Sequence, residues 1–255
     1  MADRRQVPAG SRRARGRVAS VLLGSLIGLA IVGFSALGVW QLQRRDWKLD
    51  LIARVDSRIH QPAAAAPGPA DWPSISADDD EYRRVRVTGH FLNDRETLVQ
   101  AVTDLGGGFW VVTPLVTDDG FTVLVNRGFV PPERRDPTTR TAGMASDTMT
   151  VEGLMRMTEP NGGFLRANAP AEDRWYSRDV AAIAEAKGLG DVAPYFIDAD
   201  TTNPGSYPVG GLTRVTFRNT HLVYAMTWFA LAAMALAAGV WFVREEMRRV
   251  PRGRA

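Results

Sequence analysis

Two long apolar segments without a charged residue, one near each end of the chain, most constrain how this sequence can fold. Residues 18–40 and 222–243 are uncharged runs of 23 and 22 residues. An α-helix rises about 1.5 Å per residue, so each run can cross a hydrocarbon core of about 30 Å. Both runs exceed the usual signal-peptide core of about 7–15 residues. We therefore predict an uncleaved transmembrane anchor at 18–40 and a second transmembrane helix at 221–243.

The segments flanking these runs predict the orientation of the chain in a membrane. Residues 1–17 contain six arginines and one acid, and residues 244–255 contain five arginines and two acids. Cytoplasmic flanks are enriched in positive charge, so both basic tails are predicted to be cytoplasmic and to contact the lipid bilayer. The short leader, which includes Asp3, favours a bacterial cell membrane over a mitochondrial inner membrane.

The segment between the two runs has a different charge balance. Residues 41–220 hold 20 of the 31 basic residues and 25 of the 28 acids, a formal charge of −5. No excess of positive charge therefore marks this segment for nucleic acid, and we expect no nucleic-acid partner. Because cysteine is absent, disulfides and thiolate metal sites are excluded and the segment must be stabilised by its own core.

Residue periodicity predicts how this middle segment is organised. Apolar residues at three-and-four spacing extend the first helix over 41–60 as an amphipathic extension, and four prolines make 61–81 a linker. From residue 82 to 220 we expect an extracytoplasmic, antiparallel, β-rich domain. The fold class is therefore a membrane-anchored α+β protein, in which two transmembrane helices bracket this domain and its short inserted helix at 177–188.

Individual strands can be read from alternation and turn residues. "YRRVRVTGHF" and "TLVQAV" are predicted to form one hairpin across "LNDRE", and "FWVVTPLVT" and "FTVLVNRGFV" a second across "DDG". "TMTVEGLMRM" and "APYFIDAD" predict two further strands. Within "VLVNRGFV", Asn126, Arg127 and Gly128 suggest either a recognition surface at a strand end or, slightly favoured, a bulge with a solvated Arg127.

Few residues of the middle segment carry a catalytic signature. The sequence has no phosphate-binding glycine loop, no HExxH and no GxSxG. His60 and His90 fall in the helical extension and in a strand, where a structural role is the more common one. We therefore do not expect an enzyme.

His221 differs because it stands where the second apolar run begins. In a helix, Tyr224, Thr227, Trp228 and Ala232 share its stripe, which could form a wall for a flat macrocycle held by the imidazole. The alternative is interfacial anchoring, since histidine, tyrosine and tryptophan all suit the headgroup layer. Both interpretations stay open on these residues alone.

Two further features bear on these alternatives. Cations gather at the same boundary, where they could pair with haem propionates or simply with lipid phosphate; they are Arg44, Arg45, Lys48, Arg214 and Arg218. The first run contains no His, Met or Cys and so offers no second ligand to iron. Its row of Ser20, Gly24 and Gly28 could pack against the alanine-rich second helix or against another membrane protein.

Four motifs taken in order resemble the surfeit locus protein one family of cytochrome oxidase assembly factors. They are "GVWQLQRRDWKLDLI", "YRRVRVTGHF", "VLVNRGFVP" and "NTHLVYAMTWFAL", bracketed by the two apolar runs. The resemblance covers nearly all of residues 30–243. One departure is Phe129, where the family pattern has tryptophan; phenylalanine keeps the ring and lacks the indole donor.

This resemblance implies a non-enzymatic biogenesis factor that assists haem a insertion into the catalytic subunit of cytochrome c oxidase. It further implies that His221 is the iron ligand for transiently bound haem a, as is the corresponding histidine of bacterial members. Asn219, Tyr224 and Trp228 match the surrounding pattern. With Arg218 from the cationic boundary, we predict His221, Tyr224 and Trp228 as the cofactor-binding residues. The alternative is a cofactor-free membrane scaffold that stabilises an oxidase assembly intermediate.

Overall fold

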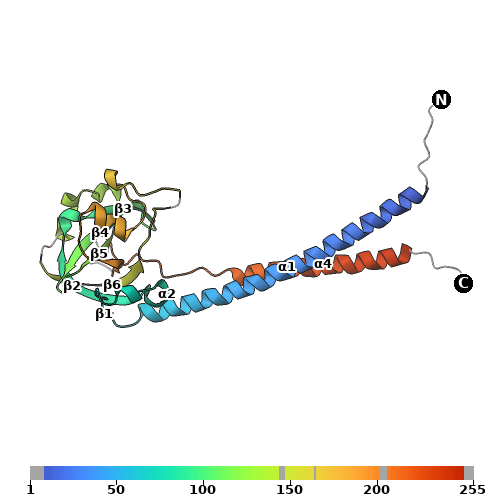
Figure 1. Cartoon of the computed structure of the whole chain (residues 1–255), viewed down its shortest axis with the longest axis horizontal. Coiled ribbons are helices and arrows are strands. Elements are labelled where there is room, and N and C mark those ends of the chain that lie inside the picture. Colours follow the sequence, from blue (N-terminus) through green and yellow to red (C-terminus); the bar gives the residue numbers. More distant parts are fainter. Residues whose placement is uncertain (1–8, 144–146, 164, 201–205, 250–255) are drawn as a thin grey trace, which may run out of the picture. The chain divides into compact units, whose positions relative to one another are not determined.

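The computed structural model describes residues 9–143, 147–163, 165–200 and 206–249 (Figure 1). The chain divides into two compact units, one comprising Met1–Ile52 and Phe217–Ala255 and the other Ala53–Thr216. The first unit is helical and the second is built on a β-sheet, and each is described by itself below.

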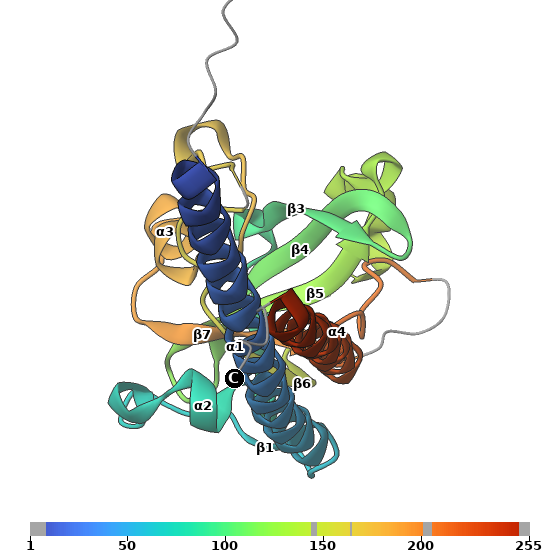
Figure 2. The same cartoon turned by 90° about the vertical axis from the view of Figure 1, so that its right-hand side faces the viewer.

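The helical unit consists of two long helices. Helix α1 spans Ala9–Ile59 and helix α4 spans His221–Arg249. The predicted anchor and its amphipathic extension thus lie in one uninterrupted helix, in line with the absence of proline between residues 9 and 61. Figure 2 shows α1 and α4 side by side, and the rings of Phe34 and Trp228 stack between them.

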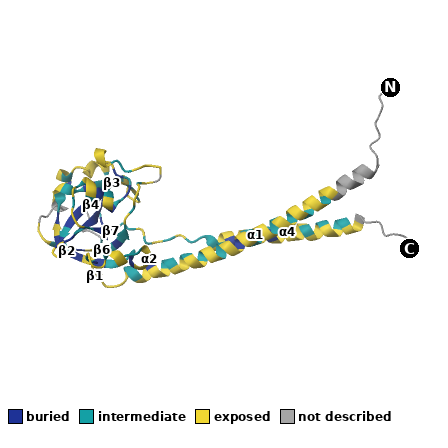
Figure 3. Ribbon diagram, viewed as in Figure 1, coloured by how far each residue is buried: buried dark blue, intermediate teal, exposed yellow. Residues whose placement is uncertain are grey.

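Both helices are long and apolar enough to cross a membrane. The qualifying helical spans are Val18–Ile59 and His221–Arg248, each of which contains an apolar stretch of at least membrane-spanning length. Their side chains are exposed along most of their length, whereas buried residues concentrate in the sheet (Figure 3). An apolar surface of this extent suits contact with lipid.

Within its described residues, the second unit contains seven strands in one sheet. The strands are β1 (Ala64–Ala65), β2 (Arg84–Phe91), β3 (Thr97–Thr103), β4 (Gly106–Thr117), β5 (Thr122–Val130), β6 (Met149–Met157) and β7 (Val192–Ala199), in the order β1-β2-β6-β7-β5-β4-β3. Two short α-helices, α2 (Ala77–Asp80) and α3 (Val180–Ala186), accompany them. Short 3₁₀ helices occupy Trp72–Ser74, Asn93–Arg95, Pro132–Arg134, Pro137–Gly143 and Pro170–Glu172.

An additional pairing between β2 and β4 closes five of these strands into a ring. Gly89 of β2 is the register partner of Thr117, and a Cβ at Gly89 would lie 2.1 Å from the carbonyl oxygen of Val116. Only glycine lets the two backbones approach this closely. The ring strands β2, β6, β7, β5 and β4 all contribute side chains to one apolar core, which includes Val85, Leu115, Val125, Met155 and Ile197.

A second apolar cluster lies on the other face of the same strands. Leu124 and Phe196 alternate with the ring-core residues along β5 and β7 and meet Ile183 of α3 and the fully buried Trp175. The strict alternation of a strand therefore supplies both cores. This second cluster holds the predicted short helix against the sheet.

The structure confirms several sequence predictions. The β4–β5 hairpin forms across "DDG", β6 and β7 form where predicted, and α3 ends just before Gly188, which has a φ of +60°. In β2, Val85 and Val87 are buried as the alternation indicated.

Other predictions were wrong. β2 and β3 do not form a hairpin; β3 pairs with β4 instead, because the Gly-rich turn after Thr103 reverses the chain with Gly106 at a φ of +101°. The sheet is not purely antiparallel, since β1–β2 and β5–β7 are parallel pairs. The predicted linker 61–81 contributes strand β1 to the sheet and packs Trp72 on the ring core.

Candidate functional site

The candidate site lies in the helical unit, where the first residue of α4 meets α1. The Nδ1 atom of His221 lies 2.7 Å from Oε1 of Gln41, and both side chains are partly buried. Asn219 accepts a hydrogen bond from the backbone N–H of His221 at 3.3 Å, which satisfies one of the unpaired donors at the start of the helix. The imidazole is therefore held by α1, and the backbone of His221 by the turn that begins α4.

The contact with Gln41 determines which ring nitrogen of His221 carries the proton. An amide oxygen can only accept, so with Oε1 of Gln41 facing the ring the contact fits the tautomer in which Nδ1 donates. Nε2 of the neutral ring then carries a lone pair. No described residue forms a hydrogen bond with Nε2 of His221. The geometry leaves one nitrogen donor of the half-buried imidazole available to a ligand.

Small and aromatic side chains continue this contact along the two helices. Ala225, one turn after His221, is 1% exposed, and the rings of Phe34 and Trp228 stack with their centroids 5.7 Å apart. Gly38 of α1 is buried, and a Cβ there would lie 2.6 Å from the ring of Phe229. Close approach of the helices therefore depends on small residues beside the histidine.

The residues predicted to share one stripe of α4 lie on two different sides of the helix. His221, Trp228 and Ala232 lie on the side that faces α1, whereas Tyr224 is 55% exposed. The hydroxyl of Thr227 donates to the carbonyl oxygen of Val223 at 3.0 Å and is also exposed. The structure thus brings His221 and Trp228 together with α1 and leaves Tyr224 on the outer flank.

The five cations predicted to gather at the membrane boundary do not form one cluster. The guanidinium of Arg44 lies 3.9 Å from the ring centroid of Trp47, and Arg45 pairs with Asp46 at 3.2 Å. Arg214 belongs to the β-sheet unit, where it pairs with Asp104 at 2.6 Å. Arg218 is exposed, and Lys48 is partly buried. Of the predicted cations, Arg218 is the one that shares the start of α4 with His221.

A separate apolar groove lies farther along the same two helices. It measures about 510 Å³ and is lined by residues such as Gly24, Gly28, Gly239 and Phe242. Gly239 follows His221 by 18 residues, a helical distance of about 27 Å, so this groove is not part of the histidine site. Ser20 donates to Glu246 at 3.3 Å and Gly24 approaches Phe242, whereas no atom lies within 4 Å of a Cβ built on Gly28.

The β-sheet unit holds a buried polar network that the sequence did not reveal. Asp198 of β7 is 4% exposed and accepts four hydrogen bonds. The donors are Asn126 at 2.7 Å, Arg178 at 2.9 Å, Thr213 at 2.9 Å and Arg156 at 3.0 Å. A buried carboxylate needs such partners, and here they come from four separate segments of the chain.

Two further acids complete this network. Glu159 accepts two hydrogen bonds from the guanidinium of Arg178, and Glu81 accepts one from Arg156. Burial raises the pKa of Glu159, but the hydrogen bonds and charge of Arg178 outweigh it and hold that pKa below its usual value. Burial likewise lowers the pKa of Arg156, yet Asp198, Tyr82 and Glu81 together raise it.

This network borders a cavity of about 260 Å³ in the β-sheet unit, lined by Arg156, Arg178, Asp198 and Arg214 among others. Arg156 and Arg178, the two largely buried arginines of the lining, are already paired with Asp198, Glu81 and Glu159. The arginines therefore do not provide uncompensated positive charge for an anionic ligand. The network instead ties the segment that carries Thr213, on the approach to α4, to the sheet.

The motif Asn126–Arg127–Gly128 forms the predicted bulge, since the β4–β5 register shifts between Trp110 and Val112, but the prediction that Arg127 is solvated was wrong. Asn126 and Arg127 are buried, and the guanidinium of Arg127 lies 4.5 Å from the ring centroid of Phe91. Burial lowers the pKa of Arg127. Gly128 has a φ of +130° and a Cβ there would lie 2.3 Å from the carbonyl oxygen of Val209. The motif seats the segment around Val209 on β5.

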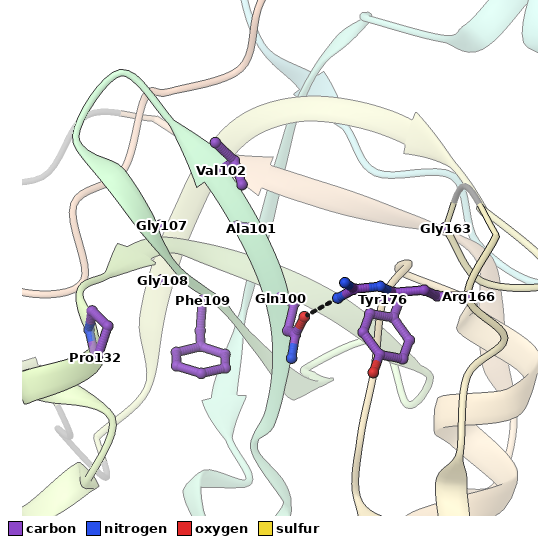
Figure 4. A pocket seen from close by; sticks show the side chains of 10 residues that line it. All are labelled: Gln100, Ala101, Val102, Gly107, Gly108, Phe109, Pro132, Gly163, Arg166 and Tyr176. Carbon is purple, nitrogen blue, oxygen red and sulfur yellow. Dashed lines mark hydrogen bonds between the residues drawn. The ribbon is translucent and has the colours of Figure 1, made fainter.

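A second surface feature of the β-sheet unit lies beside strand β3. Figure 4 shows a pocket of about 440 Å³, in which Arg166 reaches Gln100 at 3.5 Å. Val102 in its lining is 87% exposed. Leu105, three residues after Val102, and Leu165, next to Arg166 in the sequence, are 57% and 89% exposed. Exposed apolar residues around a pocket are typical of a protein contact surface.

The remaining histidines do not join a reactive cluster. His60 is exposed and contacts the carbonyl oxygen of Asp56 at 2.8 Å, and His90 is exposed on β2. Among the residues that the structure describes, no group of three or more His, Cys, Asp or Glu side chains is placed to hold a metal ion.

Comparisons with known proteins extend over both units. The sequence model of a family described as the SURF1 family matches residues 28–233, a segment that includes Gln41 and His221. Surfeit locus protein 1 of Rattus norvegicus is 42% identical over 233 residues, covering 84% of this chain and 72% of the rat protein. Surfeit locus protein 1 of Homo sapiens is 40% identical, covering 88% and 77%. A SURF1-like protein of Monosiga brevicollis is 37% identical, covering 96% and 94%.

Proposed function

The chain belongs to the SURF1 family, and from this premise we propose that it is an assembly factor for haem-copper cytochrome c oxidase that assists haem a insertion into the catalytic subunit. The proposed partner is that subunit or an assembly intermediate that contains it. No chemical conversion is part of this role, since the protein would receive a cofactor and pass it on.

The observation that carries the haem part of the proposal is the setting of His221. The imidazole stands at the first residue of α4, its Nδ1 atom is engaged by Gln41, and no described residue occupies Nε2. Haem a would supply an iron that accepts an axial nitrogen donor. His221 would provide that donor, and its partial exposure allows a ligand to reach the ring from outside the helix pair.

Other residues near His221 would support a bound macrocycle without coordinating its iron. Tyr224 presents an exposed ring one turn along α4, and Trp228 is held by stacking on Phe34. Arg218 precedes the helix and could pair with a propionate. A single protein ligand with a partly open surround would bind haem reversibly, which suits a protein that transfers its cargo.

A second candidate function is that of a cofactor-free scaffold for an oxidase assembly intermediate. The exposed Val102 in the lining of the pocket in Figure 4 favours it, as do the exposed Leu105 and Leu165, which are close in sequence to lining residues, because an exposed apolar surface suits contact with another protein. The scaffold would act through the β-sheet unit and would not require His221.

We further propose an orientation in which both basic tails lie in the cytoplasm and the β-sheet unit lies on the outer side of the membrane. The charge of the flanks supports it. The three relatives named above are eukaryotic, so they do not support the predicted bacterial cell membrane.

One experiment separates the two functions. The full chain is produced beside haem a synthesis and purified in detergent, and its haem content is measured by absorbance for the wild type, His221→Ala and His90→Ala. Haem a in the wild type and in His90→Ala, with loss in His221→Ala, supports the haem role. An unchanged haem a spectrum in His221→Ala excludes the ligand assignment, and colourless wild-type protein leaves only the scaffold.

A further inference from the structure

We infer that Gln41 is a positioning residue for His221: its side-chain oxygen fixes the imidazole as the Nδ1–H tautomer and so presents the lone pair of Nε2 to a ligand. This inference rests on the proposed function, in which Nε2 of His221 is the ligand of haem iron. The tautomer itself is a property of the unloaded protein and can be measured without haem.

The geometry of the pair is well suited to this task. The distance of 2.7 Å between Nδ1 and Oε1 is that of a strong hydrogen bond, and neither side chain is fully exposed to water that could compete for it. The partners are 180 residues apart in sequence and lie on different helices. The ring is therefore oriented by α1, while its backbone is fixed at the start of α4.

Packing on the same helices limits how far this contact can relax. Gly38, three residues before Gln41 on α1, is buried close to Phe229, and Phe34, seven residues before Gln41, stacks on Trp228. These contacts keep the two helices in register on the side that carries the histidine. Gln41 thus reaches His221 from a fixed stretch of backbone.

The chemical consequence follows from the two forms of neutral imidazole. In an isolated imidazole the proton can sit on either nitrogen. Only the form with an unprotonated Nε2 can donate the lone pair of that atom to a metal. A partner that accepts from Nδ1 selects this form and also increases the basicity of the ring as a ligand. Removing such an outer partner typically costs about 10–100-fold in affinity for the metal.

The alternative is that the same hydrogen bond only stabilises the packing of α1 against α4. The two readings differ in what each variant of Gln41 should do. Gln41→Leu replaces the hydrogen-bond acceptor with an apolar side chain of similar size. Gln41→Glu restores an acceptor oxygen, so it should rescue a positioning role and should bind the Nδ1 proton at least as strongly.

The first measurement is the nitrogen NMR spectrum of the haem-free protein labelled at histidine. The chain has three histidines, so His60→Gln and His90→Gln variants assign the signal of His221. We expect the Nδ1–H tautomer in the wild type and in Gln41→Glu, and a loss of this preference in Gln41→Leu. A wild-type His221 protonated on Nε2 at neutral pH overturns the inference.

The second measurement is titration with haem a in detergent. Gln41→Leu should bind at least about 10-fold more weakly than the wild type. Gln41→Glu should retain binding and shift the haem reduction potential to a more negative value, because a more basic ligand favours the oxidised iron. Two matched controls should bind as the wild type: Gln43→Leu, the same change at an exposed position of α1, and Ser20→Ala, which removes the bond between Ser20 of α1 and Glu246 of α4.

The outcomes distinguish this inference from the proposed function. If His221→Ala retains haem a, the ligand role of the histidine fails, and the NMR result still decides the tautomer. If His221→Ala loses haem while Gln41→Leu binds normally with an unchanged tautomer, only the role of Gln41 is lost. Should Gln41→Leu fail to fold, the wild-type tautomer and the response of Gln41→Glu decide the question.

Discussion

Asn126 on β5 and Asp198 on β7 are register partners in a parallel strand pair, and the side-chain amide of Asn126 donates a 2.7 Å hydrogen bond to Oδ1 of Asp198. The same carboxylate also receives Arg156 and Arg178. One acid on a central strand therefore pairs with two largely buried guanidinium groups, whose remaining charge Glu81 and Glu159 balance, and joins several segments of the β-sheet unit.

Replacing Asp198 with asparagine should strongly destabilise the β-sheet unit. The change keeps the size of the side chain but leaves Arg156 and Arg178 with less compensation for their burial. Breaking a buried ion pair on one side typically costs about 3–5 kcal/mol. Urea titration of the purified protein, followed by tryptophan fluorescence, measures the loss in free energy of unfolding.

The matched control for that variant is Asp104→Asn. Asp104 also pairs with an arginine, Arg214, but its side chain is 89% exposed. Exposed pairs contribute little, because water already screens and solvates both charges. An equal loss of stability in both variants would show that the buried position of Asp198 has no special importance.

The stability of the β-sheet unit should fall in acid through Glu159. The pKa of its carboxyl is lowered in the folded protein, below the ordinary value of 4.5, because Arg178 outweighs the effect of burial. The unfolded chain then takes up this proton at a higher pH than the folded chain does. The stabilisation is therefore complete above the ordinary pKa and is lost as the pH falls through the lower, folded value.

Thermal unfolding at a series of pH values between neutrality and strong acid tests this. Glu159→Gln should unfold at a lower temperature than the wild type near neutral pH, and the difference should shrink in acid as the wild type loses the charged form. The exposed Glu133→Gln serves as control. A difference between Glu159→Gln and the wild type that does not change with pH would contradict the assignment.

The proposed orientation can be tested directly because the chain contains no cysteine. Asp119→Cys places a thiol in the exposed turn between β4 and β5, and Arg248→Cys places one at the exposed end of α4. In intact cells, a maleimide that cannot cross membranes should label Asp119→Cys and should label Arg248→Cys only after the membrane is opened. The reverse pattern would place the β-sheet unit in the cytoplasm.

Local sequence patterns determined much of this protein. Uncharged runs fix two helices that can cross a membrane, because main-chain groups in hydrocarbon must bond within their own segment. Alternation of valine with polar residues identifies β2, and Asp-Gly identifies the β4–β5 turn. The importance of His221 could also be suspected from its place at the edge of an apolar run.

The tertiary structure alone decided the rest. The parallel β5–β7 pair and the closure at Gly89 join residues far apart in sequence and so could not be read from local alternation. The β3–β4 hairpin has a local signal in the glycine-rich turn at Gly106, which alternation alone does not report. The partner of His221 was hidden for the same reason: Gln41 lies in a different helix, 180 residues away. Periodicity reports which face of an element is apolar, whereas only the folded chain determines what that face meets.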